Sequence, residues 1–252
     1  MSVDVRGLKI TIGGKPIVSD ADMTIADGER VGLIGSSGSG KSMIAKAMLG
    51  LLPLTAVTNG SIDMGGTEII GASERALADL RGRYVGAVFQ NPAASLNPVM
   101  TVAQQIALPL RLHYDLTKAE RADRVNALLS KVGLDLDMAG KYPHELSGGQ
   151  AQRVVIARAI INEPKVILAD EPMSAIDVAA RIQILDTFAA IRAARPSTAI
   201  IMVSHDLGVV QHIADRILVL HDGRLEETGP TAEVLGNPQS DYTRQLIEAA
   251  SL

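Results

Sequence analysis

The string from Gly35 to Ser42 constrains the fold of this chain more than any other part of its sequence. It has the form Gly-x-x-x-x-Gly-Lys-Ser and comprises Gly35, Ser36, Ser37, Gly38, Ser39, Gly40, Lys41 and Ser42. A strand-like segment, Arg30–Ile34, precedes it, and a helix-like segment, Ser42–Leu49, follows it. Glycines let successive backbone N–H groups face one anion, and a helix N-terminus adds partial positive charge. The pattern therefore predicts a strand, a phosphate-binding loop and a helix, in that order.

The last two residues of this phosphate loop carry specific expectations. We expect Lys41 to reach the β- and γ-phosphates of a bound nucleotide, and the hydroxyl of Ser42 to hold Mg²⁺. The alternative is a glycine-rich turn that merely precedes a helix. The flanking strand and helix favour the phosphate loop, because the motif requires both.

A pair of adjacent carboxylates ends another apolar segment. Val166–Ala169 is followed directly by Asp170 and Glu171. Two like charges side by side each need a cation or a proton. We expect Asp170 to bind Mg²⁺, directly or through water, and Glu171 to orient or polarise the attacking water. The alternative is a strand end that is simply solvated.

Strand-like and helix-like segments alternate along the chain, which predicts an α/β fold with a largely parallel sheet and helical crossovers. Two turns, at Gly13–Gly14 and at Ala26–Gly28, predict hairpins and hence an antiparallel annex. The expected strands are Val3–Ile12, Met23–Ile25, Arg30–Ile34, Ser61–Met64, Val85–Phe89, Val166–Leu168, Ala199–Val203 and Ile217–Leu220. The expected helices are Lys41–Leu51, Lys118–Val132, Ser147–Ile161, Val178–Arg195 and Leu207–Ala214.

Residues 91–145 differ in character from the rest. They are expected to be mostly helical and to be divided into short helices by Pro92, Pro98, Pro109 and Pro143. We interpret them as a helical lobe inserted into one α/β core, which residues 1–90 and 146–230 form together with the annex. Residues 231–252 are expected to form a helical tail, so that 1–252 is a single domain.

The string Leu146-Ser147-Gly148-Gly149-Gln150 resembles the signature that distinguishes ABC (ATP-binding cassette) ATPases from other phosphate-loop enzymes. Ser147 is a candidate helix cap. Gly148 and Gly149 would leave their backbone N–H groups accessible to an anion, and Gln150 beside them is expected to belong to the same nucleotide-binding site. The alternative is a plain cap on a helix over Gln150–Ile161. The resemblance implies the ABC ATPase fold, which is a phosphate-loop NTPase core with an antiparallel β annex and an inserted α-helical lobe.

Further elements appear in the order that the family shows. They are Gln90 after a strand, Ser174-Ala175-Ile176-Asp177 after Glu171, and His205 after Ala199–Val203. They resemble the Q-loop, the D-loop and the switch histidine. The resemblance implies catalytic roles for Gln90 and His205, a metal contact by Gln90 and a nucleotide contact by Asp177. A lone histidine after a strand is more often structural, but its place in Val203-Ser204-His205-Asp206 favours the switch role.

The resemblance also implies that two such domains pair head to tail. ATP held by Lys41 of one copy would be closed over by Ser147–Gly149 of the other, so that one copy alone cannot complete a site. The second ATP-binding subunit would be the same chain or a paralogous one.

Three positions depart from the family's usual pattern. Ile12 stands where many members place an aromatic residue that stacks on adenine, so only apolar contact with the base is expected there. Met173 stands where Thr is common, and Ile176 stands where Leu is common. Because Asp170, Glu171 and Asp177 are all present, we expect a competent ATP hydrolase.

Two distant strings indicate a branch of the family. Phe89–Pro98 and Asn237–Leu246 resemble the corresponding stretches of dipeptide, oligopeptide and nickel importer ATPases. The resemblance implies a peripheral subunit at the cytoplasmic face of the inner membrane, bound to integral membrane permease subunits and served indirectly by an extracytoplasmic solute-binding protein. Peptide-like solutes, nickel and metallophores remain open as cargo.

Composition excludes several other classes. The 24 Lys and Arg residues against 28 Asp and Glu residues give a formal charge of −4, which argues against a nucleic-acid partner. The absence of cysteine excludes disulfides and thiolate metal sites, and no apolar run is long enough to cross a bilayer. Two alternatives stay open: a soluble ABC-type ATPase in a multi-protein complex such as phosphonate breakdown, and a binding module that uses nucleotide only as a structural ligand.

Overall fold

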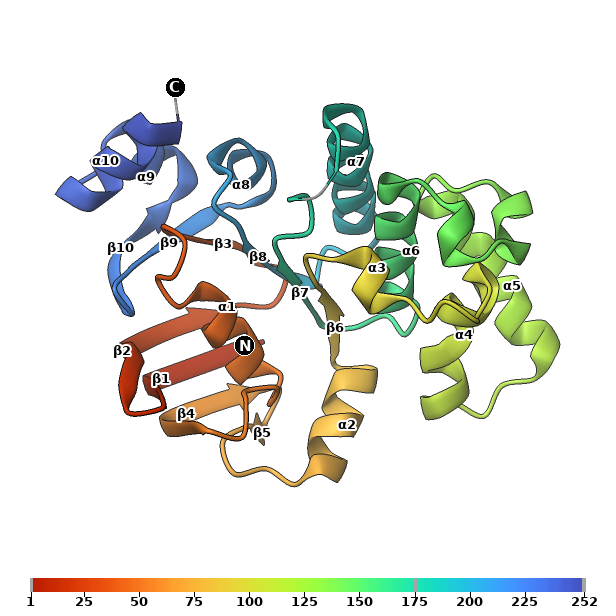
Figure 1. Cartoon of the computed structure of the whole chain (residues 1–252), viewed down its shortest axis with the longest axis horizontal. Coiled ribbons are helices and arrows are strands. Elements are labelled where there is room, and N and C mark those ends of the chain that lie inside the picture. The colour runs from red at the N-terminus through yellow and green to blue at the C-terminus, as the bar shows by residue number, and fades with distance from the viewer. Residues whose placement is uncertain (1, 175, 251–252) are drawn as a thin grey trace. The chain divides into compact units, whose positions relative to one another are not determined.

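The structure is a computed structural model that describes residues 2–174 and 176–250. The described residues fall into two compact units (Figure 1). Unit 1 takes the chain up to Ala78 and again from Ala199 onward, and unit 2 spans Asp79–Thr198. None of the helices in these described ranges is both long enough and apolar enough to span a membrane.

Unit 1 is built on a mixed sheet. Its strands lie in the order β5-β4-β1-β2-β10-β9-β3-β8. Their bounds are β1 Val3–Ile12, β2 Lys15–Ile25, β3 Arg30–Ile34, β4 Ala56–Met64, β5 Thr67–Glu68, β8 Ala199–Val203, β9 Arg216–His221 and β10 Arg224–Pro230.

The antiparallel annex predicted from the sequence lies at one side of this sheet. Strand β1 pairs antiparallel with β2 and with β4, and the turn at Gly13–Gly14 joins β1 to β2, as predicted. The hairpin predicted at Ala26–Gly28 is wrong, because β10 and β9 lie between β2 and β3. A turn signal shows where the chain reverses, but it does not show which strand pairs with which.

The central strands of unit 1 are parallel and buried. Strand β3 pairs parallel with β8 and with β9, and all its residues are buried. Helix α8 (Leu207–Ile213) packs directly on β3, because a Cβ at Gly32 would lie only 2.3 Å from Val210. The other helices of this unit are α1 Lys41–Met48, α9 Thr231–Gly236 and α10 Asp241–Ala250, while α2 Glu74–Arg83 runs across the boundary between the units.

Unit 2 is mainly helical. Two parallel strands, β6 (Val85–Val88) and β7 (Val166–Asp170), carry its sheet. Its helices are α3 Pro92–Ser95, α4 Val102–His113, α5 Lys118–Lys131, α6 Gly148–Ile160 and α7 Val178–Ala194, with short 3-10 helices at Leu136–Gly140 and Pro143–Glu145. Helix α6 is the centre of the packing, since it contacts α3, α4, α5, α7 and β6.

The prolines of residues 91–145 do not all divide helices. Pro92 begins α3, Pro98 lies between α3 and α4, and Pro143 begins a 3-10 helix. Pro109 instead lies inside α4, so the prediction that it separates two helices is wrong. One proline removes only one N–H from the helix ladder. The capping box at Thr101 and the buried side chains of α4 offset that loss.

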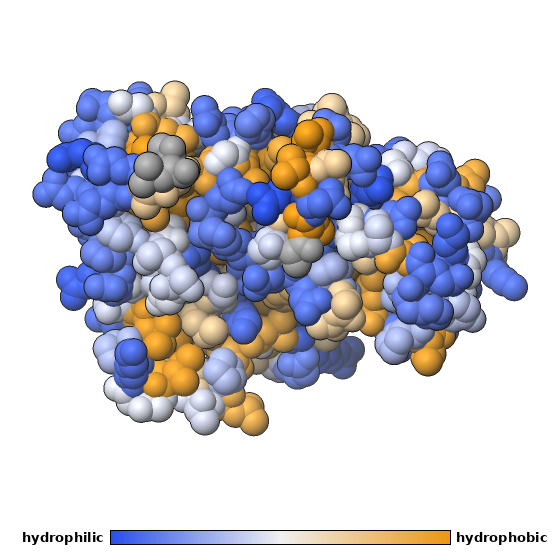
Figure 2. Space-filling view, turned by 45° about the horizontal axis from the view of Figure 1, so that its top comes forward, coloured by the Kyte–Doolittle hydropathy of each residue, from blue (hydrophilic) through white to orange (hydrophobic). Residues whose placement is uncertain are grey.

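The surface is largely polar. Figure 2 shows hydrophilic side chains over most of the viewed face, with apolar side chains in small groups between them. Val178 and Ile182 lie one turn apart on α7 and are 73% and 56% exposed.

Candidate functional site

The phosphate loop lies between β3 and α1 of unit 1, as predicted. Lys41 begins α1 and is only 7% exposed. Its Nζ donates hydrogen bonds to the carbonyl oxygens of Gly35 and Ser36, both over 2.8 Å, and lies 3.5 Å from Ser39 Oγ. The ammonium group is therefore held inside the curve of the loop.

Two glycines in the loop serve different purposes. At Gly35, with φ 152°, a Cβ would lie 2.2 Å from the carbonyl oxygen of Leu220, so no larger residue fits. At Gly38, with φ 85°, a Cβ would meet nothing within 4 Å. Gly35 thus packs the loop against β9, whereas Gly38 leaves its outer face open to a ligand.

The remaining loop residues divide by exposure. Ser36, Ser37 and Gly38 are exposed, while Ser39 and Gly40 are buried behind them. Gly40 caps α1 in a left-handed conformation, and Ser42 is half-buried in the first turn of that helix. The first N–H groups of a helix have no partner within it, so this end of α1 suits an anion.

Unit 1 carries two more of the sequence-predicted residues. Ile12 ends β1 and is half-buried beside the Gly13–Gly14 turn. His205 is exposed and lies two residues after the end of β8. Its neighbours fix its backbone, because the Asp206 N–H donates to Ser204 Oγ and the Asp206 carboxylate caps α8 by accepting from Val209 N.

Unit 2 carries the two adjacent carboxylates. Asp170 is the last residue of β7 and is only 7% exposed. Glu171 has a φ of 50°, a left-handed conformation that costs a non-glycine residue about 1–3 kcal/mol and is concentrated at functional sites. Ser174 supports it, since its N–H and its hydroxyl both donate to the Glu171 carbonyl oxygen.

The signature string begins helix α6. Ser147 caps the helix, as predicted: its Oγ accepts from Gln150 N over 3.2 Å, and Gln150 Oε1 accepts from Ser147 N over 2.9 Å. Gly148 is exposed, whereas Gly149 lies so close to α7 that a Cβ would meet Ala180 at 2.6 Å. The capping box satisfies Gln150 N and leaves the preceding N–H groups at the open end of the helix.

Gln90 and Asp177 complete the predicted set in unit 2. Gln90 is exposed and follows β6. Asp177 caps α7, its carboxylate accepting from Ala180 N over 2.8 Å. Ala175, in the string that resembles the D-loop, lies outside the described residues. Each unit thus gathers part of the predicted site: unit 1 the phosphate loop, Ile12 and His205, and unit 2 the signature, the carboxylates, Gln90 and Asp177.

One contact of the loop was not foreseen. The N–H of Ser36 donates a hydrogen bond over 2.8 Å to the hydroxyl of Tyr242, in the C-terminal helix α10. The sequence did single out Asn237–Leu246, but only as the mark of a branch. Nothing in the sequence indicated that this segment reaches the phosphate loop.

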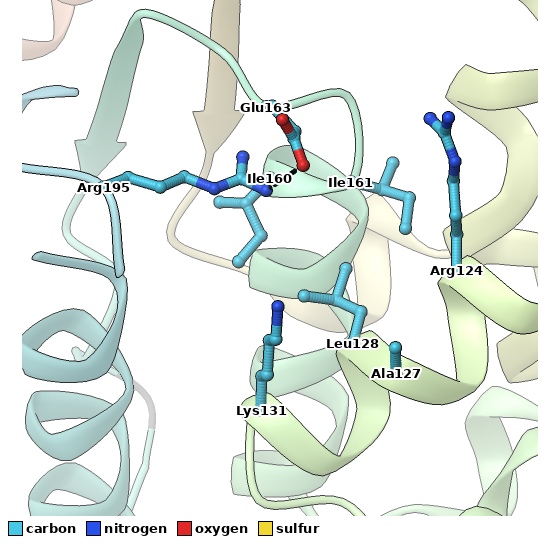
Figure 3. Close-up of a pocket in the computed structure, with 8 residues that line it drawn as sticks. All are labelled: Arg124, Ala127, Leu128, Lys131, Ile160, Ile161, Glu163 and Arg195. Atoms are coloured by element: carbon cyan, nitrogen blue, oxygen red, sulfur yellow. Dashed lines mark hydrogen bonds and ion pairs between the residues drawn. The ribbon is translucent and has the colours of Figure 1, made fainter. Parts of the chain in front are cut away.

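A cavity of about 280 Å³ in unit 2 lies apart from all these motifs (Figure 3). An ion pair between Arg195 and Glu163 lies at its edge. Its lining contains none of the sequence-predicted site residues and consists of Arg124, Ala127, Leu128, Lys131, Ile160, Ile161, Glu163 and Arg195. It is therefore not the predicted nucleotide site.

Comparison with known families decides the class of the protein. A family model described as ABC transporter matches residues 18–174, which is more than half of the chain. The chain belongs to the ABC transporter family. The prediction from the signature string is thus confirmed, and ATP binding and hydrolysis, which are general to the family, apply to this chain.

Related proteins extend the match over nearly the whole chain. The oligopeptide transport ATP-binding protein OppF of Salmonella typhimurium is 40% identical over 236 residues, covering 93% of this chain and 69% of that protein. The peptidoglycan transport ATP-binding protein YejF of Agrobacterium fabrum is 41% identical over 255 residues, covering 98% of this chain and 46% of that protein.

Solved structures of ABC cassettes have the same fold. The ATP-binding cassette MJ0796, solved as a dimer bound to ADP and Pi, gives a TM-score of 0.81 at 29% identity and covers 91% of this chain and 98% of that one. The protein cbiO1 from Clostridium perfringens, part of the transporter complex cbiONQ, gives 0.81 at 28% identity and covers 93% and 90%. The predicted ABC ATPase fold is therefore confirmed.

Proposed function

We propose that this chain is the ATP-hydrolysing subunit of an importer for peptides or peptide-like solutes. The observation that carries the proposal is the identity of about 40%, over nearly the full chain, to proteins named as oligopeptide transport ATP-binding proteins. The branch strings Phe89–Pro98 and Asn237–Leu246 support the same assignment. Nickel and metallophores remain alternative cargoes, which the uptake experiment below distinguishes.

The phosphate loop holds the triphosphate in this proposal. The backbone N–H groups of the loop and of the start of α1 face the phosphates, and Lys41 turns from the loop carbonyls to the β- and γ-phosphates. The exposed Ser36, Ser37 and Gly38 line the approach. Ile12 gives an apolar contact to the base without aromatic stacking.

The residues proposed for Mg²⁺ fit its chemistry. Ser42, Asp170 and Gln90 offer a hydroxyl, a carboxylate and an amide oxygen, and Mg²⁺ prefers oxygen ligands. Mg²⁺ is usually held by one or two protein carboxylates together with the phosphates of its substrate. When bound, Mg²⁺ neutralises charge on the phosphates.

Glu171 and His205 are the proposed catalytic side chains. Glu171 follows the buried Asp170 directly and is half-buried, at the point where the left-handed backbone ends the path of β7. Its carboxylate orients the attacking water and polarises it by accepting a hydrogen bond from it. His205 and Gln90 stabilise the reacting phosphate, and their contacts with it differ before and after hydrolysis, which couples the state of the nucleotide to the conformation of the chain.

A second cassette completes each site in this account. The N-terminus of α6, with Ser147, Gly148 and Gly149, closes on the γ-phosphate held by the other copy. Asp177 lies at the same interface, next to the exposed apolar Val178 and Ile182 of α7. ATP draws the two copies together, and hydrolysis with phosphate release parts them.

An importer also needs other subunits, namely a membrane pore and a protein that binds the solute. Integral membrane permease subunits would receive the motion through the region from Gln90 to Pro98, and an extracytoplasmic solute-binding protein would choose the cargo. The chain would then lie at the cytoplasmic face of the inner membrane. We keep the helical lobe 91–145 and the tail 231–252 as proposed divisions of one cassette, although residues 251 and 252 lie outside the described range.

Co-purification followed by reconstituted uptake tests the function. We expect the tagged chain to recover integral membrane permeases, and the purified complex in liposomes to import an oligopeptide in an ATP-dependent manner. Recovery of soluble enzymes alone would favour a soluble ABC-type ATPase, as in phosphonate breakdown. Uptake of nickel or a metallophore without uptake of peptide would correct the cargo but not the class.

A further inference from the structure

The C-terminal helix reaches the phosphate loop through one side chain. Tyr242, the second residue of α10, accepts a hydrogen bond from the backbone N–H of Ser36, over 2.8 Å. The two residues are 206 positions apart in the sequence. Both belong to unit 1, and none of the roles proposed above uses Tyr242.

The ring of Tyr242 is held by a second contact. It stacks on the ring of His221 with centroids 3.7 Å apart and planes 3° from parallel. His221 ends β9, just before the turn to β10. In that turn the Gly223 N–H donates over 3.0 Å to the carbonyl oxygen of Ser39, also in the phosphate loop. The phosphate loop is therefore held by two hydrogen bonds, one from Ser36 to Tyr242 of α10 and one from Gly223 of the β9–β10 turn to Ser39.

The start of α10 is fixed to the sheet. The Glu227 carboxylate on β10 accepts from the N–H groups of Gln239 and Ser240, over 2.9 and 3.1 Å, and Ser240 Oγ accepts from Tyr242 N. Partial burial alone would raise the pKa of Glu227, but hydrogen bonds outweigh it and hold that pKa below its ordinary value. The carboxylate thus stays ionised near neutral pH and keeps Tyr242 in place.

Tyr242 and Lys41 hold the same residue of the loop. The Ser36 N–H donates to Tyr242, while the Ser36 carbonyl oxygen accepts from Lys41 Nζ. We propose that Tyr242 is a positioning residue for nucleotide binding: its hydroxyl fixes Ser36 so that the phosphate loop is already shaped for the phosphates. Ordering a loop in advance raises affinity, because less freedom is lost on binding. The inference rests on the nucleotide site proposed at 35–42 and does not depend on the cargo.

The substitution Tyr242→Phe isolates the hydroxyl, because it keeps the ring that stacks on His221. The loss of one hydrogen bond predicts that the Kd of the full chain for ATP rises about two- to tenfold. In the assembled transporter the KM for ATP should rise by a similar factor while kcat changes little. Amide hydrogen exchange in the peptide that contains Ser36 should become faster without nucleotide. Tyr114→Phe, the same chemical change in unit 2, should alter none of these values.

A Lys41→Ala variant separates failure of the inference from failure of the site. If Lys41→Ala loses ATP binding while Tyr242→Phe binds ATP as tightly as wild type, the positioning role is wrong. If Tyr242→Phe lowers the thermal unfolding midpoint but leaves the Kd for ATP unchanged, the hydrogen bond between Tyr242 and Ser36 only stabilises the C-terminal helix. That result would also overturn the proposal. If Lys41→Ala binds ATP normally, the proposed site is wrong and the inference falls with it.

Discussion

Lys41 Nζ donates a hydrogen bond to the carbonyl oxygen of Gly35 over 2.8 Å, although the two residues lie at opposite ends of the phosphate loop. This contact closes the loop on itself. Gly35 in turn lies against β9, where a Cβ would come within 2.2 Å of the Leu220 carbonyl oxygen. The shape of the loop therefore depends on contacts within unit 1 as well as on its glycine content.

The two loop glycines should respond differently to substitution. Gly35→Ala places a methyl group against backbone, so we expect the free energy of unfolding to fall by about 1–3 kcal/mol from overpacking. Gly38→Ala meets no neighbour, so its stability should fall by about 1–2 kcal/mol from its left-handed backbone alone. Its methyl group would point toward the open face, where ATP is expected. Chemical denaturation and ATP titration of both variants measure the two effects.

The pair serves as its own control. Both variants should be less stable than wild type, but the Kd for ATP should rise more in Gly38→Ala than in Gly35→Ala, because only the methyl group at position 38 would point toward ATP. Equal ATP affinity in Gly38→Ala and wild type would show that this face of the loop does not meet the phosphates.

The cap of α6 should contribute to both stability and turnover. Ser147→Ala removes the hydroxyl that accepts from Gln150 N, and loss of such a cap costs about 1 kcal/mol. If Ser147 also contacts the nucleotide of a second copy, ATP turnover of the assembled complex should fall. This fall should be larger than in a variant that loses the same free energy of unfolding at another helix cap. Denaturation and phosphate release are the two measurements.

Helix α4 offers a matched control for this experiment. Thr101 and Gln104 form the same reciprocal box as Ser147 and Gln150. Thr101→Ala should therefore cost a similar free energy of unfolding while leaving turnover near the wild-type value. Equal turnover in the two variants would reduce Ser147 to a structural cap.

Glu171→Gln should abolish hydrolysis while sparing ATP binding. The amide keeps the size of the side chain but cannot take a proton from water, and loss of a general base lowers rates about 10²- to 10⁴-fold. Phosphate release and ATP titration of the assembled complex test this. Glu163→Gln is the control, because Glu163 shares the positive φ but lies outside the motifs. Unchanged turnover in Glu171→Gln would remove Glu171 from the catalytic role.

Acid should weaken unit 1 partly through Glu29. Burial alone would raise the pKa of Glu29, but hydrogen bonds from Arg216 Nε (2.6 Å) and Ala26 N (2.8 Å) outweigh it and hold the pKa below its ordinary value. A lowered folded-state pKa adds stability above the unfolded-state pKa, and this stability is lost as pH falls through the folded-state pKa.

Glu29→Gln should therefore be less stable than wild type at pH 7 by about 1–2 kcal/mol. The difference should shrink as the pH falls below the ordinary glutamate range, since wild-type Glu29 then becomes protonated. Thermal unfolding midpoints of both proteins between neutral and acid pH measure the gap. A gap that stays constant over this range would contradict the assignment.

Much of the core could be predicted because its signals are local. Val3–Ile12, Arg30–Ile34 and Ala199–Val203 were predicted with the bounds that β1, β3 and β8 have, since each is a run of β-forming residues ended by a turn or a motif. The cap at Ser147 was predicted for the same reason: the box involves residues only three positions apart.

Features that depend on distant parts of the chain could not be predicted. Strand β10 has no buried residue, so it shows no apolar run, and its place between β2 and β9 depends on pairing across the whole chain. Pro109 is tolerated because buried neighbours hold α4 together. The contact of Tyr242 with Ser36 joins two segments that only the folded sheet brings together.

Cross-linking between two copies tests the central claim most directly. The chain contains no cysteine, so Ser37→Cys in the phosphate loop and Leu146→Cys at the first position of the signature string introduce its only thiols. The matching positions of a paralogous subunit would be changed too, if the complex contains one. With ATP and Mg²⁺, a short thiol-specific cross-linker should join the two motor subunits, and omitting ATP or adding Lys41→Ala should prevent it. A complex that binds and hydrolyses ATP without ever forming this cross-link would contradict the account.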